Sequence, residues 1–182
     1  MKSYFTNYDD LAVAWATGDC KPYSYTAKKR MFTEHDRIYS YGAHFCIARK
    51  FLDFVLITER TYSPTTRTHI EAVSSAVRDS RLIPLPSVDV IPSDYSLTDL
   101  KNTVMENECA KLDEAIKKYL RTVRPWSRDL WTFEAAEKTL AKLGMQLPSE
   151  YDHKRYLIGE HYDRRSERNI VLRAKLRLVG KL

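Results

Sequence analysis

Two short motifs in the first half of the chain concentrate side chains that could bind a charged or aromatic ligand. One runs from Tyr39 to Phe45 (YSYGAHF) and the other from Tyr62 to His69 (YSPTTRTH). Both combine tyrosine, histidine and hydroxyl side chains, and the second also contains an arginine. Cations and hydroxyl groups bind phosphates, and aromatic rings stack on bases. The motifs therefore indicate a surface that recognises nucleic acid rather than a standard catalytic centre.

The second motif predicts a helix whose N-terminus could bind an anion. Ser63 is suited to cap this helix, and Pro64 to occupy its first position. The free N–H groups and the positive end of the helix dipole attract phosphate there. The residues that could complete the site are Arg60, Thr65, Thr66 and Arg67. An ordinary capped helix with solvated arginines is the alternative.

The tyrosines of the first motif predict a stacking surface. Tyr39 and Tyr41 alternate with Ser40, so in a strand both rings face the same side of the sheet. Rings on a strand can stack on the splayed bases of a single strand. They can also cover a small core, and both interpretations stay open.

Two histidines could approach each other if the helix packs beside the strands. His44 and His69 would then form a metal half-site or an acid–base pair. No aspartate or glutamate lies near either residue at a ligand-like spacing. Structural hydrogen bonding is therefore favoured, and neither a metal ion nor a cofactor is predicted.

The positive charge of the chain is concentrated at its C-terminal end. Residues 154–182 contain nine Lys and Arg but three Asp and Glu, so this segment carries the whole formal net charge of +6. A localised basic segment on a neutral body indicates an anionic partner. Arginine binds phosphate or carboxylate through forked hydrogen bonds. The predicted contact residues are Arg164, Arg165, Arg168, Arg173, Lys175 and Arg177.

Several classes of protein are not expected from this sequence. No run of about 18 apolar residues is present, which argues against a membrane span. The first residues, MKSYF, do not resemble a secretory signal, so a cytoplasmic protein is expected. The three cysteines are widely scattered, which argues against a disulfide framework. The common nucleotide-binding and hydrolase motifs do not occur, so an enzyme is not expected.

Hydrophobic patterning predicts an α+β fold that begins with a small antiparallel meander. A helix is predicted at 8–17, between an N-cap at Asn7 and Gly18. Residues 31–33, 37–41, 45–48 and 54–58 alternate as four short strands joined by hairpin-length turns. The helix that follows Ser63, at 64–79, should pack on one face of these strands.

The second half of the sequence predicts mainly helices. Residues 82–95 contain three prolines and are interpreted as an extended strap. Helices are predicted at 97–123, from Thr132 to Gly144, and from Arg155 to about 168, followed by a strand with one basic face. The predicted organisation is therefore an α+β module at 1–81, the strap at 82–95 and a helical region at 96–182.

The span from Met31 to Val77 resembles a module of uncharacterised proteins from phages and gut bacteria. The stretch Tyr39–Ala48 matches the recurring words YSYGxHFxIA, and Tyr62–His69 matches YSxTTxxH. The resemblance carries no established activity, and it implies an origin on a mobile genetic element. Phage accessory proteins of this size commonly block host defences or bind DNA, and the chain resembles a type II anti-CRISPR protein in this respect.

The expected function is therefore non-enzymatic binding of nucleic acid or of a nucleoprotein nuclease of bacterial defence. As a type II anti-CRISPR protein, the chain would use its basic end to obstruct target DNA binding by the effector. One alternative is a DNA-binding autorepressor, possibly a homodimer. Another is a metal-dependent nuclease that uses His44 or His69.

Overall fold

The computed structural model describes residues 2–43, 45–89, 91–92, 94–121 and 128–163. The chain divides into two compact units, residues 1–95 and 96–182. The first unit contains a mixed sheet with helices, and the second is helical. This arrangement confirms the predicted α+β class with a helical C-terminal half.

A seven-stranded sheet forms the framework of the first unit, and its strands lie side by side in sequence order. The two outermost pairs, β1 with β2 and β6 with β7, are parallel, whereas every pair between them is antiparallel. The strands are β1 (Lys2–Phe5), β2 (Cys20–Thr26), β3 (Met31–Glu34), β4 (Arg37–Ser40), β5 (Cys46–Phe51), β6 (Phe54–Thr58) and β7 (Leu82–Leu85).

The meander predicted between residues 31 and 58 is confirmed as β3 to β6. The predicted strap at 82–95 is partly wrong, because its first four residues form β7 and pair with β6. Pro84 is tolerated there because β7 is an edge strand, where a missing N–H need not break a ladder. Strands β1 and β2 were not predicted; β1 has four residues, and β2 contains Pro22.

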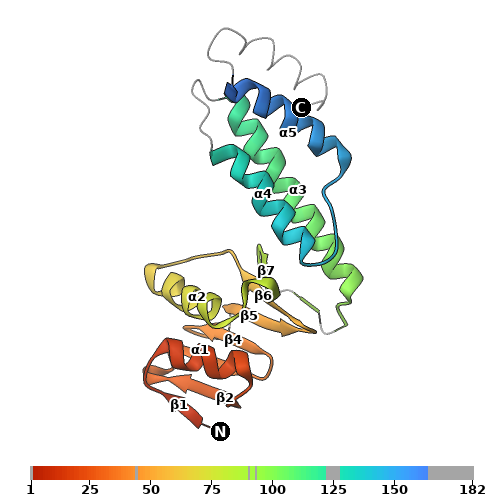
Figure 1. The fold of residues 1–182 in the computed structure, drawn as a ribbon. Helices are drawn as coiled ribbons and strands as arrows, with labels where there is room; N and C mark the ends of the chain where they lie inside the picture. The colour runs from red at the N-terminus through yellow and green to blue at the C-terminus, as the bar shows by residue number, and fades with distance from the viewer. Residues whose placement is uncertain (1, 44, 90, 93, 122–127, 164–182) are drawn as a thin grey trace. The chain divides into compact units, whose positions relative to one another are not determined.

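Two helices, α1 (Tyr8–Thr17) and α2 (Pro64–Ala76), lie side by side on one face of the sheet (Figure 1). The cap of α1 is confirmed, since Asn7 accepts a hydrogen bond from the Asp10 N–H at 2.7 Å. Gly18 ends the helix in the left-handed conformation, with a φ of 84°. Helix α2 ends three residues before the predicted boundary of 79.

The main core of the first unit fills the space between the two helices and the sheet. Trp15 of α1 is 1% exposed, although an indole is rarely buried so completely. Alternate residues of the strands point toward the helices, and their apolar side chains pack in the same core as Trp15. The residues of this core include Leu11, Trp15, Met31, Ile38, Ile47, Val55, Ile57 and Val73.

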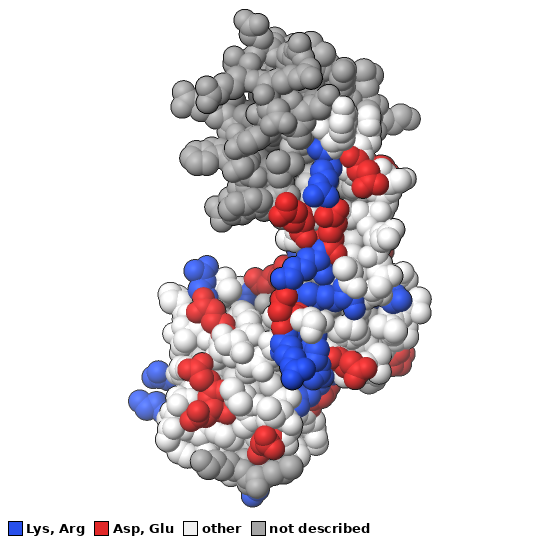
Figure 2. All heavy atoms as spheres, viewed as in Figure 1, with Lys and Arg blue, Asp and Glu red and all other residues white. Residues whose placement is uncertain are grey.

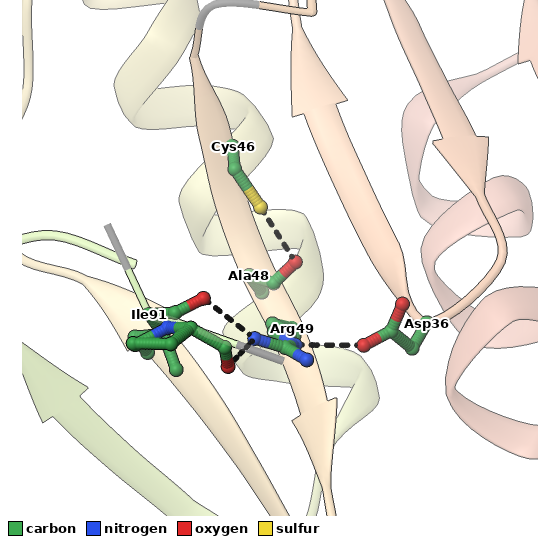
Figure 3. Close-up of polar contacts among 6 residues, drawn as sticks. Asp36, Cys46, Ala48, Arg49 and Ile91 are labelled. Carbon is green, nitrogen blue, oxygen red and sulfur yellow. Dashed lines mark hydrogen bonds and ion pairs between the residues drawn. The ribbon is translucent and has the colours of Figure 1, made fainter. Parts of the chain in front are cut away.

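Described residues of the segment after β7, residues 86–95, contact β5 and β6, and we call this segment the strap. Arg49 of β5 fastens it, because its Nη1 donates to the Ile91 and Pro92 carbonyl oxygens at 2.9 and 3.2 Å (Figure 3). The Nε of Arg49 donates to the Asp36 carboxylate at 2.7 Å. The Cys46 N–H donates to Asp89 at 2.7 Å. Three of these contacts hold the strap in place, and the contact with Asp36 orients the Arg49 side chain.

The Cys46 side chain lies close to the fastened part of the strap. Its thiol donates to the Ala48 carbonyl oxygen at 3.2 Å (Figure 3), and it is fully buried. Burial raises the pKa of this thiol to about 12, with the Asp89 carboxylate acting in the same direction. Cys46 is thus an inert core residue and not a nucleophile.

The second unit contains three helices: α3 (Leu97–Arg121), α4 (Arg128–Ala141) and α5 (Ser149–Asp163). The capping signal at Ser96 is confirmed, because Ser96 accepts from the Asp99 N–H and Asp99 accepts from the Ser96 N–H. Helices α3 and α4 pack side by side (Figure 1). In the described part of the chain, no helix has the length and apolar character needed to span a bilayer.

Two predicted helix starts in the second unit are wrong. Helix α4 begins at Arg128 and not at Thr132, because a threonine is tolerated inside a helix as well as at its cap. Helix α5 begins at Ser149, six residues before Arg155, since Ser149 and the carboxylates of the first turn suit a helix N-terminus. The predicted end of this helix and the basic strand after it lie outside the described residues.

Candidate functional site

Aromatic side chains occupy paired positions on four neighbouring strands. Tyr4 of β1 pairs with Tyr25 of β2, Tyr25 pairs with Phe32 of β3, and Phe32 pairs with Tyr39 of β4. Paired residues point to the same face of a sheet. Met31, the neighbour of Phe32, lies in the core under the helices, so these four rings lie on the opposite face. We call Tyr4, Tyr25, Phe32 and Tyr39 the aromatic row.

The aromatic row is open to solvent at its β1 end and covered at its β4 end. Tyr4 is 51% exposed, Tyr25 is 37% exposed and Tyr39 is 5% exposed. The Tyr4 and Tyr25 rings meet edge to face, with centroids 5.9 Å apart. The Phe32 and Tyr39 rings are stacked at 5.0 Å. The outer rings of the row, Tyr4 and Tyr25, are thus accessible to a ligand, whereas Tyr39 is buried.

A pocket of about 420 Å³ lies beside the row, and we call it the aromatic pocket. Its lining includes Tyr23, Tyr25, Lys29, Phe32 and Tyr41. The Nζ of Lys29 lies 5.6 Å from the centre of the Tyr25 ring, a cation–π contact. The volume falls within the range of about 300–1,000 Å³ that small-molecule sites occupy. The pocket therefore offers flat rings and a cation to one ligand.

Polar contacts fix two tyrosines beside the pocket. The hydroxyl of Tyr23 lies 2.9 Å from Nε2 of His35, and the two rings meet at 5.1 Å. Tyr39 is hydrogen-bonded to Arg37; burial raises the pKa of Tyr39 and this hydrogen bond opposes the rise. Arg37 is two residues from Tyr39 on the same strand, so it adds a cation to the face that carries the row.

Among the described residues, left-handed backbone occurs at five residues other than glycine, and two of them, Lys29 and Tyr41, line the aromatic pocket. His35 and Leu52 need no special explanation, since two-residue hairpin turns require this conformation. Lys28, Lys29 and Tyr41, with φ of 58°, 50° and 60°, are not in such hairpins. Because this conformation is costly for a lysine or tyrosine, its presence makes these three residues candidates for a functional role.

The expectation that Tyr39 and Tyr41 share one face is wrong. Strand β4 ends at Ser40, and the left-handed Tyr41 breaks the alternation. Tyr39 lies in the row, whereas the Tyr41 ring lies 5.6 Å from that of His69, which is on α2. Tyr41 nevertheless lines the aromatic pocket and is 48% exposed.

The predicted anion site at the N-terminus of α2 is largely occupied by the protein itself. Ser63 accepts the Thr66 N–H at its side chain and the Arg67 N–H at its carbonyl oxygen. Pro64 has no N–H to offer. Thr66 is buried and Thr65 is half-buried, while Arg60 and Arg67 are exposed. Of the groups expected to bind phosphate, only the two arginines keep an exposed head.

His69 is a fully buried residue between two tyrosines. Its Nδ1 lies 2.7 Å from the Ser40 hydroxyl, and its ring lies 4.2 Å from that of Tyr8. Burial, together with the charge of Arg30, lowers the pKa of His69 to about 4. Its Nε2 is buried without a hydrogen-bond partner. His69 is therefore a neutral core residue, and the predicted approach to His44 cannot be described because His44 lies outside the described residues.

The described residues contain no group of three or more His, Cys, Asp or Glu arranged to hold a metal ion. The predicted basic contact residues, from Arg164 to Arg177, lie outside the described residues. On the face of the first unit in Figure 2, acidic and basic side chains are interspersed with large uncharged areas. Among the described residues, the candidate site is built mainly from aromatic side chains.

Sequence reasoning missed most of this surface. Tyr4, Tyr23, Tyr25, Lys29 and Phe32 were not among the predicted site residues. The alternation of Tyr23, Ser24 and Tyr25, followed by Lys28-Lys29-Arg30, is a usable signal for an aromatic strand with a basic turn. It becomes informative only once residues 20–26 are recognised as a strand.

Comparisons of this chain with models of known protein families, with curated proteins and with solved structures found no match.

Proposed function

We propose that this chain binds single-stranded nucleic acid on the aromatic face of its first unit. The observation that carries the proposal is the aromatic row, with paired ring positions on four neighbouring strands and its β1 end open to solvent. Bases of any type stack on exposed rings, so a row of this kind supports binding with little sequence preference. Single strands fit better than duplexes, because duplex bases are already stacked on each other.

Three consecutive cations support the same proposal. Lys28, Lys29 and Arg30 lie in the turn between β2 and β3, next to the aromatic pocket. All three are exposed, and within the described part of the chain none of them forms an ion pair. Unpaired cations beside exposed rings suit a phosphodiester backbone whose bases contact those rings.

The narrower expectation of a type II anti-CRISPR protein stays a prediction. A surface for single strands is compatible with it, because a nucleoprotein effector exposes guide RNA and a displaced DNA strand. The contribution expected from Arg164 to Arg177 belongs to the same prediction. No catalytic role is part of the proposal.

The proposed function is tested by measuring fluorescence anisotropy of labelled oligonucleotides titrated with the full chain. We expect dT15 and rU15 to bind more tightly than a 15-base-pair duplex. If three phosphates are neutralised, affinity for the single strands should fall roughly 20-fold between 50 and 200 mM salt. Tighter binding to the duplex would favour the autorepressor alternative, and no binding to any of the three would refute the proposal.

Replacing Lys29 with glycine should make the folded chain more stable but weaken its binding of single strands. Glycine adopts the left-handed conformation without a steric cost, so we expect the free energy of unfolding to rise by about 1 kcal/mol. The same change removes the cation over Tyr25, so affinity for dT15 should fall. Urea unfolding and anisotropy measure the two effects. Unchanged affinity in a stabilised variant would show that Lys29 takes no part in binding.

A further inference from the structure

A second pocket, of about 320 Å³, lies against the same basic turn. Its lining includes Thr6, Asn7 and Tyr8 at the start of α1, together with Lys28 and Arg30. The residue between these two cations, Lys29, lines the aromatic pocket instead. Adjoining residues of the turn therefore line different pockets. Their Cα atoms are only about 3.8 Å apart, so the two pockets lie close together.

The two pockets differ in chemistry. The aromatic pocket includes four aromatic residues and one cation in its lining, whereas the second pocket includes two cations, two hydroxyl-bearing threonines and only one aromatic residue, Tyr8. The nearby carboxylate of Asp10 accepts a hydrogen bond from the Asn7 amide at 3.0 Å. It is therefore part of the helix cap and forms no ion pair with Lys28 or Arg30. The second pocket suits an anion, and the aromatic pocket suits a flat ring.

One buried side chain contacts the walls of both pockets. The His69 ring lies against Tyr8 of the second pocket and Tyr41 of the aromatic pocket. Its Nε2 is fully buried and has no hydrogen-bond partner. An unpartnered buried nitrogen is rare, because it forfeits a hydrogen bond that water would supply in the unfolded chain. The ring that lies between Tyr8 and Tyr41 thus carries a buried nitrogen without a hydrogen-bond partner among the described residues.

We propose that the second pocket is a phosphate subsite, in which Lys28 and Arg30 hold a phosphodiester of the strand whose neighbouring base lies in the aromatic pocket. This inference rests on the proposed function and specifies how one nucleotide is held. The left-handed backbone at Lys28 and Lys29 serves this arrangement, since it turns successive side chains toward different pockets. Lys29 then lies beside the base, and its two neighbours in the chain, Lys28 and Arg30, bind the adjoining phosphate.

The test compares the trinucleotide d(TpTpT) with the same molecule carrying two uncharged methylphosphonate linkages. Both probes are titrated against the full chain and against the double variant Lys28→Gln/Arg30→Gln. We expect the methylphosphonate probe to bind the unchanged protein about fivefold more weakly, as two exposed charge pairs would give. In the double variant this difference should disappear, while the base-dependent binding persists.

A matched control removes the same number of charges elsewhere. The double variant Arg60→Gln/Arg67→Gln changes two exposed arginines at the N-terminus of α2. We expect it to keep the fivefold difference between the two probes. If Lys28→Gln/Arg30→Gln also keeps the full difference, the phosphate subsite is overturned while single-strand binding stands. If neither probe binds the unchanged protein and dT15 also fails to bind, the proposed function itself fails.

The pKa of His69, measured by NMR titration, gives a second readout that does not depend on affinity. The groups that act on His69 are the Arg30 charge, the Ser40 hydroxyl and the rings of Tyr8 and Tyr41. A phosphate beside Arg30 offsets the charge that helps to lower this pKa. We therefore expect the pKa to rise with the phosphodiester probe more than with the methylphosphonate probe. Equal values with both probes would contradict a phosphate at this position.

Discussion

Replacing Tyr25 with leucine should weaken binding of dT15 by about 10-fold or more. Tyr25 lies in the exposed part of the aromatic row, between Tyr4 and Phe32, and carries the Lys29 ammonium near its ring. Base–aromatic stacking contributes about 1–3 kcal/mol per base, and leucine removes the ring while keeping an apolar side chain on the strand. Anisotropy with labelled dT15 at constant salt measures the change.

Two variants make the Tyr25 result specific. Tyr25→Phe keeps the ring and should bind nearly as well as the unchanged protein. Tyr156→Leu replaces a tyrosine that is 59% exposed on α5 of the second unit, and it should have no effect. Circular dichroism would verify that Tyr25→Leu is folded. A folded Tyr25→Leu variant with unchanged affinity would show that the row is not the binding surface.

Acidification from pH 7 to 4 should destabilise the first unit through His69. Burial lowers the pKa of His69 from an ordinary 6.5 to about 4 in the folded chain. Between these values the unfolded chain binds the proton that the folded chain excludes, so stability falls as the pH falls. A depression of this size corresponds to about 3 kcal/mol when the transition is complete. Urea unfolding at a series of pH values measures the loss.

The variant His69→Phe isolates this contribution from that of the carboxylates, which also titrate in acid. Phenylalanine keeps an aromatic ring against Tyr8 and removes the titrating group, although the Ser40 hydroxyl loses its partner. We expect the free energy of unfolding of His69→Phe to depend less on pH between 6.5 and 4. His153→Phe, at an exposed position on α5, should retain the full dependence. Parallel curves for both variants would contradict the assignment to His69.

The central meander and both of its helices could be predicted because their patterns are local. Alternation in β3 to β6 and the caps at Asn7 and Ser63 each depend on a few neighbouring residues. The outer strands could not be predicted in the same way. From the sequence, the residues of β7 are predicted to form a strap, because Pro84 is incompatible with a central strand. Their position at the edge of the sheet follows only from the pairing of β7 with β6.

The candidate site was harder to predict than the fold, because it is created by register. Tyr4 and Tyr25 are far apart in the sequence, and nothing local shows that they occupy paired positions on adjacent strands. Tyr41 does not continue the alternation of β4, since the strand ends before it, so the prediction that it shares a face with Tyr39 fails. The phosphate site expected at Ser63 illustrates a further limit, because a good cap uses the donors that a ligand would need.

The spacing of the rings in the aromatic row also limits how the bases of a bound strand can be spaced. Neighbouring strands are about 4.8 Å apart, and the ring centres of the exposed pair, Tyr4 and Tyr25, are 5.9 Å apart. Successive nucleotides in a helical stack rise by only about 3.4 Å. A strand whose bases stack on these rings must therefore be stretched, so that each base separates from the next. The free-energy cost of this unstacking is greatest for purine tracts and smallest for thymine or uracil. The spacing between the strands would then favour pyrimidine tracts, although no side chain contacts the edge of a base.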